Sequence, residues 1–201
     1  MQIEKAIFKQ SCQFLKDKPA EKLPEFAFIG RSNVGKSSLI NMLCNNSKLA
    51  HTSSTPGKTI LINHFLINDS FYFVDLPGYG YAKLSKTEKA RISKMNTDYV
   101  SGSKEMELIF VLIDSRHDIQ NIDMEFLFNL GNAGLPFAII FTKADKLGKN
   151  KMASQLASNK RLILEHWETL PPLFISSSES KEGREEILNY IWEVLKIIRE
   201  Q

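Results

Sequence analysis

The residues from Gly30 to Ser37, in the run GRSNVGKS, have the types and the spacing that can hold a chain of phosphates. They fit the pattern G-x-x-x-x-G-K-[ST], in which Gly30 and Gly35 let the backbone turn tightly and point successive N–H groups at the phosphates. We expect Lys36 to reach the β and γ phosphates and the Ser37 hydroxyl to bind Mg²⁺. The apolar run FAFI precedes the motif, which therefore lies at a strand-to-helix turn, although an ordinary glycine-rich turn can fit the same pattern.

A second motif, DLPG at residues 75–78, follows the apolar run FYFV. Asp75 therefore emerges at the C-terminal end of a strand, where its carboxylate can hold the water shell of Mg²⁺, and the Gly78 N–H comes near a γ-phosphate. A D-x-x-G sequence alone commonly marks only a turn. Here the motif is informative because it follows the first motif in the order that a GTPase requires.

A third motif, TKAD at residues 142–145, follows the apolar run FAIIF and separates guanine from adenine. The Asp145 carboxylate can accept hydrogen bonds from the N1–H and the exocyclic amine of guanine, whereas adenine offers neither donor at these positions. We expect Lys143 to lie along the base and to brace the phosphate loop. Ser177 and Ser178 follow the short apolar segment LFI and can present a backbone N–H to the guanine oxygen, although serine runs are commonly plain loops. The three motifs in this order predict guanine-nucleotide binding.

Alternating strands and helices must position these motifs. Strand-like runs lie near 26–29, 60–67, 70–75, 107–113, 137–141 and 173–175, and helix-like runs lie near 36–45, 86–100, 121–133, 150–167 and 184–199. This alternation predicts a three-layer α/β fold with helices on both faces of a mostly parallel, six-stranded sheet, and the hairpin at 60–75 adds one antiparallel edge strand. In the last helix, an apolar stripe indicates core packing rather than a cofactor contact; its members are Ile187, Ile191, Val194, Leu195 and Ile198.

The composition agrees with one cytoplasmic domain. The chain has 201 residues, of which 43% are hydrophobic, so it can bury one full core over residues 1–201, with residues 1–22 as a short lead-in. No stretch is apolar and long enough for a membrane span, and the N-terminus lacks the apolar core of a signal peptide. Cys12 and Cys44 lie far apart without metal spacing, which fits free thiols in a reducing compartment. The four histidines are scattered, and we assign them no metal.

Longer runs around the motifs resemble one family. GRSNVGKSSLIN, STPGKT at 54–59, VDLPGYGYAK at 74–83 and TKAD closely resemble the EngB (YihA/YsxC) family, small bacterial GTPases of the TrmE-Era-EngA-like group that act in assembly of the large ribosomal subunit. The resemblance covers nearly the whole chain. It implies a single P-loop GTPase domain, GTP and GDP as ligands, Mg²⁺ as cofactor, and a role in late 50S maturation that supports normal cell growth and division, including septation.

The resemblance also implies roles for residues outside the generic motifs. Thr59 in PGKT matches the family's switch threonine, whose hydroxyl joins Ser37 on Mg²⁺ in the GTP state, and Thr55 lies close by. Ser176 stands where the family usually has Phe, which leaves the register of the guanine loop open by one residue. The expected metal ligands are Ser37, Thr59 and Asp75. The expected nucleotide contacts are Gly30, Arg31, Ser32, Asn33, Val34, Gly35, Lys36, Ser37, Ser38, Gly57, Lys58, Thr59, Asp75, Leu76, Pro77, Gly78, Thr142, Lys143, Ala144, Asp145, Ser176, Ser177 and Ser178.

Two residues qualify the expected hydrolysis, for which the catalytic set is Lys36, Thr59, Gly78 and Asn33. In GTPases with a Gln that orients the attacking water, the Gln directly follows D-x-x-G, but Tyr79 holds that position here. Either the backbone and other groups orient the water, or a group supplied in trans completes the site. In both cases we expect slow intrinsic hydrolysis, which a ribosomal partner stimulates. In similar loops, an Asn at the position of Asn33 can hold K⁺ beside the phosphates; the alternative is an Asn that bonds only to its own loop.

A basic segment after DLPG indicates a partner. Between Lys83 and Lys94, five cations face the single acid Glu88, so the local charge of +4 exceeds the net charge of +3 for the chain. The segment must move with the γ-phosphate, and Tyr79 and Tyr81 beside it can stack on bases. A solvated helix face and a contact with ribosomal RNA phosphates both fit this pattern.

The sequence thus favours a GTP-hydrolysing switch that binds precursors of the large ribosomal subunit, both their RNA and their proteins. We expect a monomer with no membrane partner. A GTP-gated scaffold that binds RNA or the ribosome, in which hydrolysis is incidental, is the alternative from another class. A P-loop kinase for small molecules is a second alternative, but TKAD and the lack of a visible acceptor lid argue against it.

Overall fold

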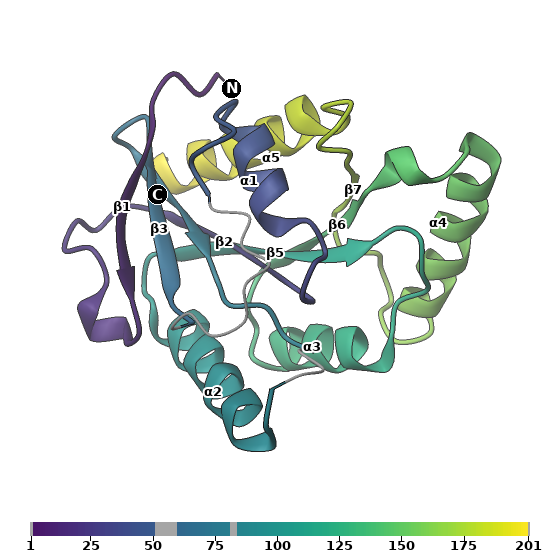
Figure 1. Cartoon of the computed structure of the whole chain (residues 1–201), viewed down its shortest axis with the longest axis horizontal. Coiled ribbons are helices and arrows are strands. Elements are labelled where there is room, and N and C mark those ends of the chain that lie inside the picture. The colour runs from purple at the N-terminus through teal and green to yellow at the C-terminus, as the bar shows by residue number, and fades with distance from the viewer. Residues whose placement is uncertain (1, 51–59, 81–83, 201) are drawn as a thin grey trace.

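A computed structural model describes residues 2–50, 60–80 and 84–200 of the chain. One sheet of seven strands runs through the described part, in the order β1-β3-β4-β2-β5-β6-β7 (Figure 1). The strands are β1 (Ala6–Cys12), β2 (Glu25–Gly30), β3 (Ile62–Ile67), β4 (Phe71–Asp75), β5 (Met106–Asp114), β6 (Phe137–Thr142) and β7 (Leu173–Ile175). The helices are α1 (Lys36–Leu43), α2 (Lys86–Gly102), α3 (Asn121–Asn132), α4 (Lys149–Leu164) and α5 (Arg184–Arg199), with short 3₁₀ turns η1 (Leu15–Asp17) and η2 (Ala144–Lys146).

The central strands form because their continuous apolar runs can be buried on both faces of a parallel sheet. Strand β2 is buried along its whole length and pairs in parallel with β4 and β5. Strand β3 alone runs against its neighbours, because a tight hairpin joins it to β4. Asn68 and Asp69 take positive φ angles of 48° and 52° there, the conformation of a two-residue turn that asparagine and aspartate tolerate.

The expected α/β class is confirmed, and the sheet has one strand more than the six that the sequence predicts. Strand β1 lies within the expected lead-in of residues 1–22 and pairs with β3, so the antiparallel strand β3 is internal and β1 forms the edge. Ile7 and Phe8 on β1 stay exposed, with a register shift after Phe8. Of the residues of β1 only Cys12, at its end, is buried, so the strand has no alternating apolar pattern and the sequence does not reveal it.

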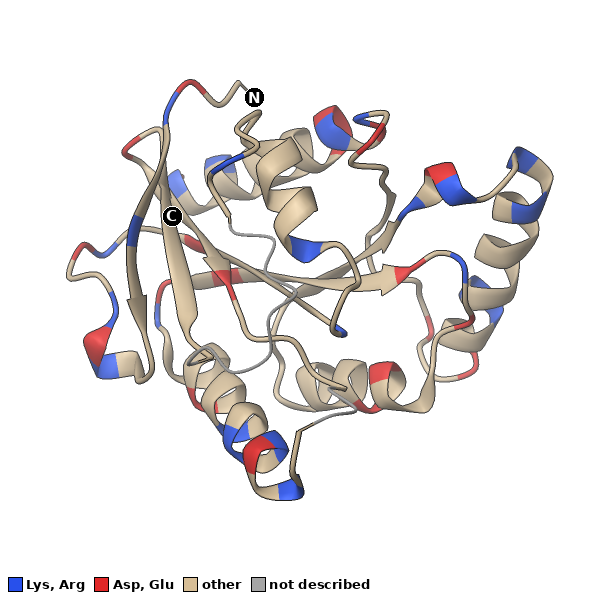
Figure 2. Ribbon diagram, viewed as in Figure 1, with Lys and Arg blue, Asp and Glu red and all other residues tan. Residues whose placement is uncertain are grey.

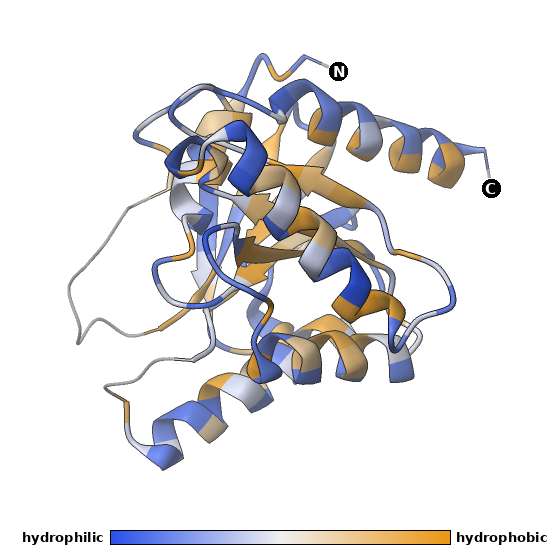
Figure 3. Ribbon diagram, turned by 90° about the vertical axis from the view of Figure 1, so that its right-hand side faces the viewer, coloured by the Kyte–Doolittle hydropathy of each residue, from blue (hydrophilic) through white to orange (hydrophobic). Residues whose placement is uncertain are grey.

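Helices cover both faces of the sheet, as predicted. Helices α1 and α5 lie on one face, where Leu39 and Ile187 join the phenylalanines of β2 and β4 in one apolar cluster. Helices α2, α3 and α4 lie on the other face, where Tyr99, Leu127 and Ile163 join a second cluster. Figure 3 shows the apolar residues concentrated on the strands and on the inner sides of the helices. No helix among residues 2–50, 60–80 and 84–200 is long and apolar enough to cross a membrane.

Both cysteines are buried and unpaired, as the sequence predicts. Burial raises the pKa of the Cys12 thiol to about 11 and that of the Cys44 thiol to about 12. Both thiols therefore stay protonated and unreactive near neutral pH.

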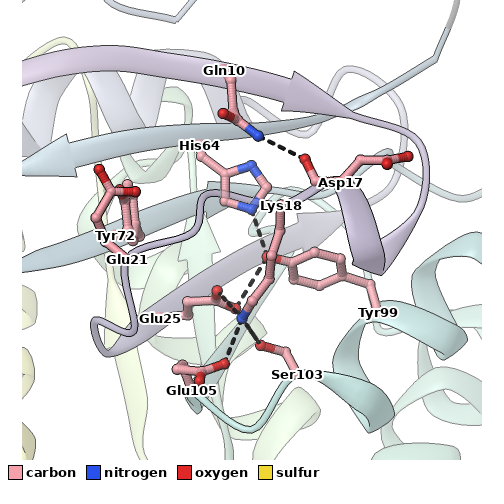
Figure 4. A network of polar contacts seen from close by, with 10 residues as sticks. All are labelled: Gln10, Asp17, Lys18, Glu21, Glu25, His64, Tyr72, Tyr99, Ser103 and Glu105. Atoms are coloured by element: carbon pink, nitrogen blue, oxygen red, sulfur yellow. Dashed lines mark hydrogen bonds and ion pairs between the residues drawn. The ribbon is translucent and has the colours of Figure 1, made fainter.

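A buried polar network fixes the sheet at the edge where the parallel strands begin (Figure 4). Glu25, the first residue of β2, is 2% exposed and pairs with the Lys18 Nζ at 2.7 Å. The same ammonium pairs with Glu105 at 2.6 Å, while the Ser103 hydroxyl donates to Glu25 at 2.7 Å. The Tyr99 hydroxyl also donates to Glu25, at 3.1 Å. The network thus joins the N-terminal segment, β2, the end of α2 and the start of β5.

His64 extends this network to β3. Its Nε2 lies 2.5 Å from the Tyr99 hydroxyl oxygen, and the ring has no exposed surface. Because the Tyr99 proton goes to Glu25, the His64 N–H is the donor to Tyr99. Burial first, and then the charge of Lys18, lower the pKa of His64 to about 4. The imidazole is therefore neutral in the folded protein throughout the physiological range.

This depressed pKa predicts a stability that falls as the pH falls from about 6.5 to about 4. In that window an unfolded chain protonates its histidine at an ordinary pKa of 6.5, while the folded imidazole stays neutral. The full difference is worth roughly 3 kcal/mol. Urea unfolding of the parent and of His64→Gln at pH 7, 6, 5 and 4 should show a weaker pH dependence in the variant.

His166, an exposed histidine, provides the matched control. His166→Gln should keep the pH dependence of the parent. Equal pH dependence in all three proteins would contradict a neutral, buried His64.

Candidate functional site

The predicted motifs meet at one edge of the sheet, where the parallel strands end (Figure 1). The phosphate loop leaves β2 at Gly30 and enters α1 through Gly35, whose φ of 102° lies in the left-handed region. A Cβ on Gly30 would lie 2.7 Å from the backbone oxygen of Leu112 on β5. Only glycine fits at this close approach, so the first position of the motif is fixed by the packing of two central strands.

The second motif is joined to the phosphate loop by its backbone. The Tyr79 N–H donates to the Gly30 oxygen at 3.1 Å, and the Ser32 N–H donates to the Tyr79 oxygen at 3.2 Å. Arg31 and Tyr79 thereby form an isolated parallel bridge beyond β2 and β4. Leu76, Pro77 and Gly78 are buried, and the Asn96 amide of α2 donates to the Pro77 oxygen at 2.8 Å.

Lys36 and Asp75 form a direct ion pair, with side chains only 15% and 11% exposed. The two predicted partners of the phosphates and of Mg²⁺ are therefore brought together. Ser37 follows Lys36 in the first turn of α1 and is partly buried, as is Ser38. No group of three or more His, Cys, Asp or Glu in the described ranges could hold a metal. One carboxylate and one hydroxyl still fit Mg²⁺, which takes few protein ligands and completes its shell with phosphate oxygens and water.

The third motif braces the phosphate loop from β6. The Thr142 hydroxyl donates to the Val34 oxygen at 2.7 Å, and the Lys143 ammonium donates to the Asn33 oxygen at 2.7 Å. Lys143 takes a positive φ of 60°, and Asn33 takes one of 63°. The expected brace is therefore present. The Asn33 side chain is exposed, and the described part of the chain shows no bond from it to its own loop.

Asp145 lies at the rim of the site and contacts the loop after β7. The Ser177 hydroxyl donates to its Oδ1 at 2.7 Å, and the Lys146 ammonium pairs with its Oδ2 at 2.9 Å. The bonds from Lys146 and Ser177 lower the pKa of Asp145, so the carboxylate is ionised at neutral pH. The Ala144 N–H donates to the backbone oxygen of the buried Ser176. Ser177 is thus the serine beside the Asp145 carboxylate, and the partly buried Ser178 follows it.

Asp114, at the end of β5, belongs to the site although the motifs do not include it. Its Oδ2 lies 2.9 Å from the Lys143 Nζ, and the Arg116 guanidinium binds both of its oxygens, at 2.7 and 2.9 Å. Burial alone would raise the pKa of Asp114, but the bonds from Arg116 and Lys143 outweigh it and hold this pKa well below its usual range. Its position at a strand end, like that of Asp75, is the signal that could have identified it.

The side chain of Tyr79 packs against helix α3. Its hydroxyl donates to the Asp123 Oδ1 at 2.9 Å, and its ring stacks on Phe126 with 5.1 Å between centroids. Asp123 is 2% exposed. Burial, and then the charge and hydrogen bond of Asp123, raise the pKa of Tyr79 well above its usual value. The phenol is therefore a neutral donor that fixes the residue after Gly78 to α3.

Three expected site residues lie outside the described part of the chain, namely Gly57, Lys58 and Thr59, and so does the neighbouring Thr55. Lys83 and Tyr81 of the basic segment lie outside it as well. Their expected roles stay predictions. The other residues of the basic segment begin helix α2, where Lys86, Lys89 and Arg91 are exposed.

Comparison with known proteins agrees with this geometry. A family model described as a 50S ribosome-binding GTPase matches residues 25–143. A probable GTP-binding protein EngB from Porphyromonas gingivalis is 53% identical over 191 residues, which cover 95% of each chain. A protein of the same name from Bacteroides fragilis is 54% identical over 196 residues, which cover 98% of each chain.

Solved structures show the same fold. The crystal structure of a probable GTP-binding protein engB has a TM-score of 0.66 and 26% identity, and the match covers 88% of this chain and 100% of that one. Era in complex with MgGDPNP and a stretch of 16S ribosomal RNA has a TM-score of 0.65 at 21% identity, over 86% of this chain and 56% of that one. The latter likeness concerns the fold alone. From the family model and the near full-length relatives, the chain belongs to the EngB family of GTP-binding proteins.

Proposed function

We propose that the chain is a GTP-hydrolysing molecular switch that acts in assembly of the large (50S) ribosomal subunit. The observation that carries the nucleotide part is the bond from Lys143 to the Asn33 oxygen, because it joins the guanine-reading motif to the phosphate loop. The family model, described as a 50S ribosome-binding GTPase, supports the ribosomal part. The proposal treats residues 1–201 as one P-loop GTPase domain that acts in the cytoplasm as a monomer, away from membranes, and that supports cell growth and division.

In the proposed binding step, the phosphates lie in the loop from Gly30 to Gly35. Lys36 turns from Asp75 to the β and γ phosphates, which frees the Asp75 carboxylate to hold the water shell of Mg²⁺. Ser37 is the direct ligand from α1, and Thr59 is expected to join it in the GTP state. The metal, when bound, neutralises the charge that develops on the phosphates. Asp145 reads the guanine edge, while Asp114 keeps Lys143 in place.

In the proposed hydrolysis step, the Gly78 N–H stabilises the γ-phosphate, and Tyr79 stands at the position of the water-orienting Gln. The neighbouring Tyr79 is occupied with Asp123. Intrinsic hydrolysis is therefore slow, and a ribosomal partner completes the site. A GTP-gated scaffold with incidental hydrolysis differs in one respect: 50S particles would leave its rate of hydrolysis unchanged. The K⁺ ion expected beside Asn33 stays a prediction.

The proposed ribosome contact is the exposed start of α2. Lys86, Lys89 and Arg91 follow the motif that senses the γ-phosphate, and Ser85 caps the helix through a reciprocal pair of bonds with Glu88. The other end of α2 is fixed by Tyr99 in the buried network. Gain or loss of the γ-phosphate can therefore change where the cations of this helix lie relative to ribosomal RNA.

Asp145→Asn should weaken GTP binding by at least about a hundredfold, because the amide cannot accept both guanine donors. Binding of xanthosine triphosphate should improve relative to GTP, since its extra carbonyl needs a donor. Titration calorimetry with GTP, ATP and xanthosine triphosphate measures this. Glu179→Gln, which removes an exposed carboxylate from the neighbouring loop, is the control and should bind like the parent. Equal affinity of the parent for ATP and GTP would overturn the assignment.

Tyr79→Phe should destabilise the protein by about 1–3 kcal/mol, because the buried Asp123 loses a donor. It should also lower the rate of GTP hydrolysis more than it changes GTP affinity, because Gly78 loses its fixed neighbour. Thermal unfolding and single-turnover kinetics measure the two effects. Tyr190→Phe, a partly buried tyrosine on α5, serves as the control. Parent-like melting and hydrolysis of Tyr79→Phe would remove Tyr79 from the proposed mechanism.

Changing Lys86, Lys89 and Arg91 together to Glu should weaken binding to 50S precursors at least about tenfold and leave GTP affinity unchanged, since the three side chains lie outside the nucleotide motifs. The parent should bind more tightly with a non-hydrolysable GTP analogue than with GDP. Sedimentation with ribosomal particles measures both. The matched control changes Lys16, Lys22 and Lys104, three exposed lysines outside α2, to Glu. If the α2 variant sediments with ribosomal particles as well as the parent does, this end of α2 is only a solvent-exposed surface and does not contact the ribosome.

A further inference from the structure

Helix α4 carries more positive charge than any other described helix. It contains Lys149, Lys151, Lys160 and Arg161 and no acidic residue, so its charge is +4. The whole chain has a net charge of +3, so the remaining residues together have a charge of −1. In Figure 2 the cations lie toward both ends of α4, on the far side of the molecule from α2. We call these four residues the α4 cations.

The stability of the fold does not account for the α4 cations. Among residues 2–50, 60–80 and 84–200, none of the four forms an ion pair with an acidic side chain. Lys149 and Lys151 lie in the first turn, which has no acidic residue. Cations are unfavourable there, because the helix dipole is positive at its N-terminus. By contrast, Lys94 on α2 pairs with Asp98 one turn later.

The outer side of α4 lets a partner come close. With 100° per residue, Lys149, Lys160 and Arg161 lie within a sector of about 120°, and the small residues Ala153 and Ala157 lie between them. Lys149 and Lys160 are about 16 Å apart along the helix axis. The inward side carries the buried Ile163. Cations at both ends of a helix, separated by small neutral side chains, can contact phosphates at several positions along a nucleic-acid backbone.

The side-chain bonds that hold α4 do not involve residues 75–79. The side chain of Asn159 is fully buried and accepts from the Ile119 N–H at 2.9 Å. Gln155 donates to Asp118 at 2.6 Å. These bonds fix α4 to the loop after β5, whereas DLPG contacts α2 and the following Tyr79 contacts α3. A contact through α4 therefore persists in both nucleotide states.

We propose that the α4 cations bind the phosphate backbone of double-stranded RNA, independently of whether GTP or GDP is bound. The choice of RNA as the partner rests on the proposed ribosomal function. The cationic surface itself is an observation on α4 and does not depend on that function. Double-stranded RNA presents its phosphates in regular rows and is recognised by shape and backbone rather than by sequence. The outer side of α4 offers no aromatic residue for insertion into a lipid surface or for base stacking.

The test compares the parent with a variant in which all four α4 cations are changed to Gln. Binding to a 20-base-pair RNA duplex is measured by fluorescence anisotropy at several salt concentrations, with GDP and with a non-hydrolysable GTP analogue. We expect the variant to bind at least about tenfold more weakly in both nucleotide states, with a salt slope shallower by about 3. Its GTP affinity should equal that of the parent, which verifies the fold.

The control changes Lys16, Lys22, Lys48 and Lys104 to Gln, which lowers the net charge equally and removes exposed lysines elsewhere. A control that weakens as much as the α4 variant, or an α4 variant that binds like the parent, overturns the proposal. The same proteins are also tested on vesicles with anionic lipids. If the α4 variant loses vesicle binding but keeps RNA binding, the proposal is overturned. A parent that binds neither the duplex nor 50S particles contradicts the proposed function as well. If only the α2 variant loses 50S binding, the proposed function stands and the α4 proposal fails.

Discussion

The ammonium group of Lys143 is the contact on which the arrangement of the site depends. It lies 2.7 Å from the Asn33 oxygen and 2.9 Å from the Asp114 carboxylate, so one charge joins the phosphate loop to the ends of β5 and β6. A loop rich in glycine has many conformations to lose on folding. Fixing it from a neighbouring strand prepares its N–H groups for a ligand before the ligand arrives, which lowers the entropic cost of binding.

At the opposite edge of the sheet, a buried charged group likewise joins several segments of the chain. Glu25 satisfies its charge through Lys18, Ser103 and Tyr99, and would be costly to bury without them. Together with Glu105, which also pairs with Lys18, the network joins the N-terminal segment, β2, the end of α2 and the start of β5, so it specifies how these four segments fit together. It fixes the end of α2 that is remote from the nucleotide motifs. The motif-bearing edge is left to respond to a ligand, while the frame behind it stays in place.

The sequence predicts most of the site, because each motif follows a strand whose continuous apolar run is easy to recognise. Three features are not predicted, each for a physical reason. Strand β1 is buried only at its last residue, Cys12, and owes its conformation to pairing with β3. Asp114 acts through bonds to Lys143 and Arg116, which only the folded sheet brings together. The direction of the Tyr79 side chain depends on a partner in α3 that lies 44 positions away in the sequence.

The burial of α2 is uneven, so its exposed first part can move while its buried second part stays in place. Residues 86–91 are all exposed, whereas Ile92, Asn96, Tyr99 and Val100 are buried. Between Lys86 and Tyr99 the helix extends about 20 Å. A tilt of about 10° around Tyr99 would therefore move the first turn by about 3 Å, which is the length of one hydrogen bond. If α2 binds a partner's phosphates as proposed, a small displacement at this end of the helix is enough to make or break the contact of a cation with a phosphate.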